Sequence, residues 1–62
     1  MDFRKLTEDE RDTLRISFLN TFNDPTVPMI VRNKAQFLYD SLVETEHQIT
    51  NERRIKEVKH ND

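Results

Sequence analysis

The chain has 62 residues, of which 35% are charged and 34% hydrophobic, with a formal net charge of −2 and neither cysteine nor glycine. A chain of this length forms one domain at most and buries only about 60% of the surface that its unfolded form exposes. The missing cysteines exclude disulfides and thiolate metal sites, and the negative charge does not favour a general attraction to nucleic acid or to anionic lipid.

The first helix is predicted to begin at Thr7. Thr7 and Glu10 have the three-residue spacing of a capping box, and the acidic residues 8–10 complement the positive end of the helix dipole. Leu6 lies where a hydrophobic staple would begin, but its expected mate is Arg11, so this staple is imperfect. We expect a helix over about residues 7–22.

This helix carries one apolar stripe at steps of four, made of Leu14, Phe18 and Phe22 and widened by Leu19. Arg11 and Arg15 flank the stripe and can lay their methylene stems along it. Ile16 points to the opposite side, either as a single exposed residue or as part of a second contact surface.

A turn follows over residues 23–28, which include Asn23, Asp24 and two prolines. Each proline disfavours the α conformation of the residue before it. Because the connection is short, the helices on either side should pack as antiparallel neighbours.

The second helix is predicted over about residues 29–58. Its apolar residues alternate at steps of four and three, as in a coiled-coil seam: Val31, Ala35, Leu38, Leu42, Thr45 and Ile49. Ile30 and Phe37 extend this face on one side, and Tyr39 and Val43 extend it on the other. A face this broad suits a helix with more than one neighbour.

The pattern fades after Ile49, where Ile55 and Val58 are the only apolar residues and lie off the seam. We expect the helix to fray toward its C-terminal end. The basic residues gather here: Arg53, Arg54, Lys56, Lys59 and His60. They complement the helix dipole without any ligand, and acidic residues interleave with them.

These elements predict an all-α protein, one domain over residues 1–62, in which a shorter and a longer helix form a hairpin that pairs into a four-helix bundle. A fully disordered chain is the alternative, because the apolar content is low. The helical stripes and five aromatic residues argue against disorder, and a β-rich fold would lack the glycine that its turns use.

The sequence contains little that could carry out catalysis. Glu44 and His47 have the Glu-x-x-His spacing of di-iron bundles, but the neighbouring carboxylates flank the seam instead of lying on it. No phosphate-binding loop can form without glycine, and no serine or threonine has an identifiable His and acid arranged around it. We expect no catalytic residues, no metal, no cofactor and no small-molecule substrate.

The sequence therefore favours a non-enzymatic interaction protein, a small regulator or inhibitor that forms a homodimer and binds a larger protein. The contact residues expected for that partner are the apolar ones off the core, Ile16, Tyr39, Ile55 and Val58. Met1 suggests a whole small protein, the N-terminus does not read as a signal peptide, and the lack of cysteine fits the cytoplasm.

Two alternatives remain open. The first is a dimeric nucleic-acid-binding regulator that uses Arg53, Arg54, Lys56 and Lys59 to contact phosphates, although no aromatic residue lies among them to stack on bases. The second is a structural assembly subunit, which would form higher-order oligomers instead of a closed dimer. No apolar run is long enough for a membrane span.

Overall fold

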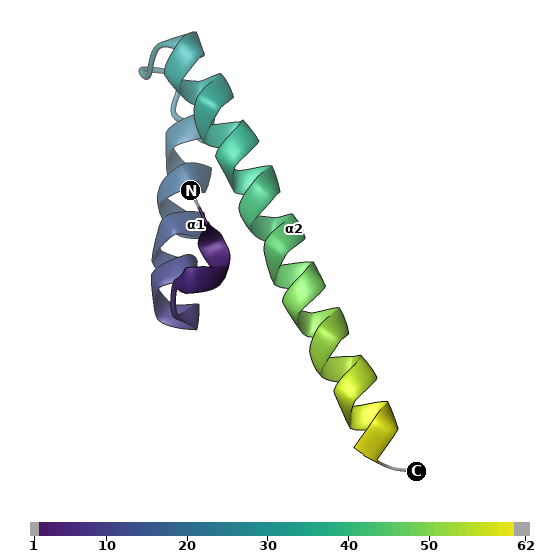
Figure 1. Ribbon diagram of the computed structural model, residues 1–62. Coiled ribbons are helices and arrows are strands. Elements are labelled where there is room, and N and C mark those ends of the chain that lie inside the picture. The colour runs from purple at the N-terminus through teal and green to yellow at the C-terminus, as the bar shows by residue number, and fades with distance from the viewer. Residues whose placement is uncertain (1, 61–62) are drawn as a thin grey trace.

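The computed structural model describes the backbone of residues 2–60 and the side chains of residues 2–54, and it is a helical hairpin (Figure 1). A short 3₁₀ helix, η1 (Phe3–Lys5), precedes helix α1 (Glu8–Asn23), and the long helix α2 (Met29–His60) returns antiparallel to it. The molecule is a rod of 53 × 17 × 17 Å. The predicted all-helical hairpin is confirmed, whereas the pairing of two hairpins into a bundle goes beyond this single chain.

Helix α1 begins at the capping box that the sequence predicts. The Glu10 backbone N–H donates to the Thr7 hydroxyl at 3.2 Å, and the Thr7 N–H donates to the Glu10 carboxylate at 2.9 Å. These two bonds satisfy N–H groups that have no partner inside the helix. The helix ends at Asn23, one residue later than expected.

Asp24 organises the turn between the helices. Its carboxylate Oδ1 accepts from the Thr26 hydroxyl at 2.7 Å and from the Thr26 backbone N–H at 2.9 Å. These hydrogen bonds hold the pKa of Asp24 below its usual value. The stability that they contribute is therefore fully present above the unfolded pKa of about 3.9, and it is lost as the pH falls through the lower folded value.

The apolar core is small and centres on Leu42. Leu42 is completely buried, and the other buried apolar side chains among the described residues are Ala35 and Phe3. The rest of the predicted seam is less covered: Leu38, Thr45 and Ile49 are half-buried and Val31 is exposed. The α1 stripe of Leu14, Phe18 and Phe22 is also only half-buried. One helix of 16 residues cannot cover the whole apolar face of a helix of 32.

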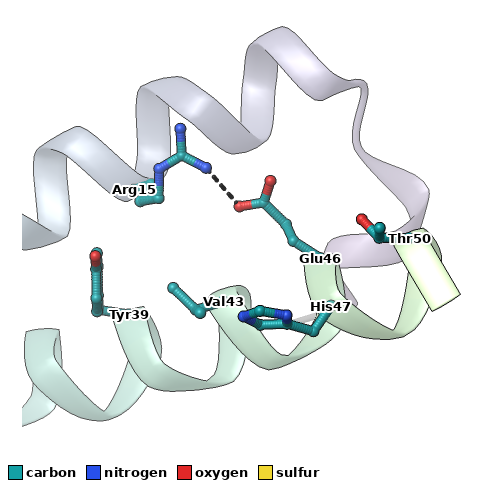
Figure 2. Close-up of a pocket in the computed structure, with 6 residues that line it drawn as sticks. All are labelled: Arg15, Tyr39, Val43, Glu46, His47 and Thr50. Carbon is teal, nitrogen blue, oxygen red and sulfur yellow. Dashed lines mark hydrogen bonds and ion pairs between the residues drawn. The ribbon is translucent and has the colours of Figure 1, made fainter.

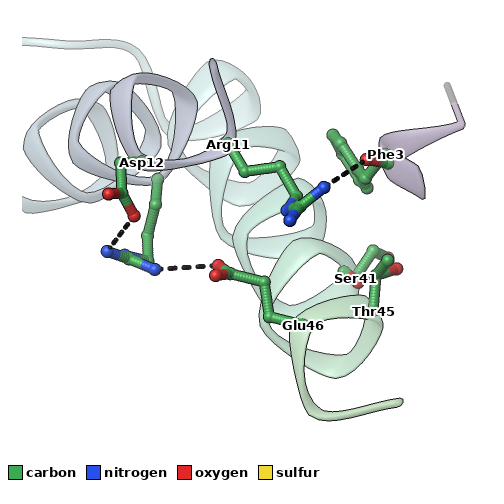
Figure 3. Close-up of polar contacts among 7 residues, drawn as sticks. Phe3, Arg11, Asp12, Ser41, Thr45 and Glu46 are labelled. Atoms are coloured by element: carbon green, nitrogen blue, oxygen red, sulfur yellow. Dashed lines mark hydrogen bonds and ion pairs between the residues drawn. The ribbon is translucent and has the colours of Figure 1, made fainter. Parts of the chain in front are cut away.

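Arg11 holds η1 against the two helices. Its guanidinium is buried, and Nη1 donates to the backbone carbonyl of Leu6 at 2.6 Å and to that of Phe3 at 3.5 Å (Figure 3). The Phe3 ring meets the Phe18 ring edge-on, with centroids 6.5 Å apart. The sequence placed only the methylene stem of Arg11 along the stripe, whereas the structure uses its charged head to anchor the N-terminal segment.

Replacing Leu42 by alanine tests the core. Truncating a completely buried leucine to alanine should lower the free energy of unfolding by about 2–5 kcal/mol. This loss is a large part of the total unfolding free energy of so small a domain. Thermal and urea denaturation followed by circular dichroism measure this loss. The control, Ile16→Ala, removes an exposed side chain and should change stability by less than about 0.5 kcal/mol. Equal effects of the two substitutions would contradict this core.

The anchoring role of Arg11 is tested by Arg11→Ala. Losing charge-assisted hydrogen bonds to one buried and one partly buried carbonyl should cost about 1.5–3 kcal/mol. It should also speed hydrogen exchange of the Leu6 amide, which donates to Phe3 within η1. Arg54→Ala removes an exposed guanidinium and serves as the matched control. If Leu6 exchanges at the same rate in both variants, Arg11 does not hold η1.

Candidate functional site

Two of the open grooves that follow the line where α1 meets α2 have linings of different chemistry. We call the first the Tyr39 face; it is lined by Arg15, Tyr39, Val43, Glu46, His47 and Thr50 (Figure 2). We call the second the Phe18 face; it is lined by Ser17, Phe18, Thr21, Ile30, Val31, Lys34, Ala35 and Leu38. The first combines an aromatic ring with charged and polar groups, and the second is almost wholly apolar.

An ion pair between the helices borders the Tyr39 face. Arg15 on α1 donates through Nη1 to Glu46 on α2 at 2.8 Å and through Nη2 to Asp12 at 2.6 Å (Figures 2 and 3). The hydrogen bond to Glu46 is the main cause of a raised pKa of Arg15, which keeps the guanidinium charged. The groove beside it encloses about 320 Å³.

Tyr39 is half-buried and contributes to packing. Its ring meets the Phe22 ring edge-on, with the centroids 5.3 Å apart and the planes at 74°, an arrangement that aromatic pairs favour. The sequence predicted Tyr39 as an off-core contact residue. The structure places Tyr39 between the core and the groove: one part of its ring packs against Phe22 of α1, and another part lines the groove.

Ile16, the second predicted contact residue, is 56% exposed on α1. Leu19 is also exposed and lies one helical turn beyond Arg15, on the same side of the helix. Sequence reasoning assigned Leu19 to the core stripe, so its exposure is a correction. The side chains of Ile55 and Val58, the other two predicted contacts, lie outside the described residues.

The basic residues proposed for nucleic acid are only partly described. Arg53 donates to Glu8 at 3.3 Å across the hairpin, and Arg54 is exposed. Nearby, Arg4 of η1 pairs with Glu52 at 3.0 Å. The side chains of Lys56 and Lys59 lie outside the described residues. Within the described part, acidic neighbours therefore engage Arg53.

In the described part of the chain, no further metal-ligating side chains are arranged around Glu44 and His47 to complete a metal site. Within the described residues, no cluster of three or more His, Cys, Asp or Glu side chains is arranged to hold a metal ion. Glu44 is exposed, and His47 lies on the Tyr39 face beside Glu46, whose carboxylate accepts from Arg15.

Two large, exposed apolar side chains lie in or beside the Phe18 face, and sequence reasoning did not include them among its site residues. Ile30, which is 84% exposed, lines this groove of about 410 Å³. Phe37, which is 63% exposed, lies beside it, because its ring is in contact with Lys34 of the lining. The sequence did contain a signal for this exposed surface, because Ile30 and Phe37 extend the apolar face of α2 beyond its seam. Periodicity shows which side of a helix is apolar, but not how far a shorter partner covers it.

Comparison of the chain with protein-family models, curated proteins and solved structures finds no match. No helix within the described residues combines the length and apolar character that crossing a membrane requires. The chemistry of the two faces is therefore the basis for proposing a function.

A double-mutant cycle measures the Arg15–Glu46 interaction. Both side chains are partly exposed, so we expect a coupling free energy of about 0.2–1 kcal/mol that decreases with added salt. The cycle compares the unfolding free energies of wild type, Arg15→Ala, Glu46→Ala and the double variant, which removes the separate contribution of Asp12. Zero coupling at low salt would show that this pair does not shape the Tyr39 face.

Proposed function

We propose that this chain is a non-enzymatic protein–protein interaction module, a small regulator or inhibitor that binds a larger protein through the Tyr39 face. The supporting observation is the lining of that face, which combines Tyr39 and Arg15 with Val43, Glu46, His47 and Thr50. Tyrosine and arginine are enriched among the residues that contribute most to binding free energy at protein interfaces. A mixed apolar and polar lining is typical of partners that also exist apart.

The geometry favours binding because its main side chains are already ordered. Arg15 is held by Glu46 and Asp12, and Tyr39 is held by the ring of Phe22. Side chains fixed before association lose less conformational entropy when a partner arrives. The partner expected here presents an apolar side chain to the groove between Tyr39 and Val43, and a hydrogen-bonding group to His47 at its edge.

A binding role also agrees with the chemistry of the groove. General acid–base catalysis needs a titratable group that another group orients toward a substrate. On this face the Glu46 carboxylate accepts from Arg15, an arrangement suited to shaping a surface. A cytoplasmic setting fits a chain without cysteine. Ile55 and Val58 remain predicted contacts, which would extend the partner-binding surface toward the C-terminal end of α2.

Site-specific photo-crosslinking in cell extract tests the proposal. A benzophenone side chain at position 50, where Thr50 is exposed and lines the Tyr39 face, should give a discrete adduct heavier than two copies of this chain. The matched control carries the same group at position 40, where Asp40 is exposed on the side of α2 away from α1. A second substitution, His47→Glu, changes the charge of the groove at an exposed position and should abolish the adduct while the circular dichroism spectrum stays the same.

Three outcomes would contradict the proposal. They are equal adducts from position 40, an adduct that survives His47→Glu, or adducts that contain only this chain. An adduct that nuclease removes would instead favour the nucleic-acid alternative, whose binding should weaken steeply with salt.

A further inference from the structure

The single chain exposes more surface than a folded protein of its mass normally does. Its accessible surface is 5162 Å², whereas the scaling for folded monomers gives about 4,200 Å² for its 7.5 kDa. The excess, about 900 Å², is close to the ~800 Å² that each partner contributes to a standard protein interface. The radius of gyration agrees: it is 14.8 Å, against about 11 Å for a compact domain of this length.

The exposed apolar surface of the Phe18 face has two complementary parts. Ile30 and Phe37 form a ridge of large, exposed side chains along α2, since residues seven apart lie on one side of a helix. The groove beside the ridge includes the small residues Ser17, Thr21 and Ala35, and it has a volume of about 410 Å³. Small residues let another helix approach closely, and large ones fill the space between helices.

The chain itself shows how such a groove is filled. Phe3 inserts from η1 and is buried, with its ring against the edge of the Phe18 ring. Phe18 also lines the open groove. Figure 1 shows η1 beside α1, away from the turn. The N-terminal segment therefore covers one part of this side of the hairpin, and the groove lined by Thr21, Ile30 and Val31 stays open.

We propose that a second copy of this chain covers the Phe18 face, with the ridge of each copy lying in the groove of the other. A two-fold interface brings the same patch of both molecules together, so that patch must contain both the projecting and the receiving part. The Phe18 face has both, and the elongated chain as a whole exposes more surface than a compact monomer of its mass. The product is a four-helix bundle formed by two hairpins.

The charges on this face are compatible with that packing. Among the described residues, Lys34 is the one charged side chain that lines the groove, and its ammonium lies 5.4 Å from the centre of the Phe37 ring. A cation above an aromatic face is stabilised there while its stem covers apolar surface. Lys34 can therefore stay at the edge of the interface with its charge toward water. The Tyr39 face lies apart from this interface, so the dimer and the proposed partner site are independent.

Sedimentation equilibrium over a wide concentration range tests the dimer. We expect a monomer–dimer equilibrium in the wild type and a dissociation constant at least about a hundredfold larger in Phe37→Glu, as for the loss of a central interface residue. Ile16→Glu places the same charge at an exposed position on α1 outside the Phe18 face, and its dimer should be unchanged. A wild type that stays monomeric up to millimolar concentration, or equal weakening by both substitutions, would overturn the proposal.

A second measurement applies even if Phe37→Glu fails to fold. The chain has no cysteine, so a single introduced thiol can be joined only to another copy. A short bis-maleimide should link Lys34→Cys into a dimer efficiently and Leu19→Cys poorly, because position 34 lines the Phe18 face at the edge of the interface and position 19 does not line it. Preferential linkage at position 19, or equal linkage at both, would overturn the proposed face.

Discussion

The structure depends on the packing of a 16-residue helix against a 32-residue helix around one completely buried side chain, Leu42. Helix α1 can cover one strip of the broad apolar face of α2, and it leaves the borders of that face partly open. The N-terminal segment supplies a second cover, because Arg11 binds two backbone carbonyls and so keeps Phe3 in the core. Ile30 and Phe37 have no such cover from the described residues, so the unequal lengths of the helices leave an apolar surface available for association.

The two grooves suit different uses because their linings differ. The Phe18 face is apolar and contains both a ridge and a groove, which are the properties of an interface between identical subunits. The Tyr39 face joins an ordered arginine and a tyrosine to polar neighbours, as surfaces for separable partners do. In our account the hairpin gains stability by pairing through the first face and binds a larger protein through the second.

Local rules predicted the features that depend on neighbours in the sequence. The capping box at Thr7, the hairpin around the prolines and the outward direction of Ile16 all follow from spacing and residue type. Periodicity also identified Ala35 and Leu42 as seam residues, but not the depth to which Phe18 and Phe22 are buried. The hydrogen bonds from Arg11 to the Leu6 carbonyl and from Arg15 to Glu46 were not predictable, because they join groups that no sequence period relates. The Tyr39 face was missed as a unit for the same reason, since its groove exists only once α1 and α2 meet.

The most direct test of this account is an isotope-filtered nuclear Overhauser experiment on a mixed sample of labelled and unlabelled chains. Such a spectrum records only contacts between different molecules. We predict intermolecular signals from the ring protons of Phe37 to the methyl protons of Thr21 and Ala35, as the ridge of one copy enters the groove of the other. Intermolecular signals confined to Ile16 and Tyr39, or none at concentrations where the chain is dimeric, would contradict the assignment of the Phe18 face to self-association.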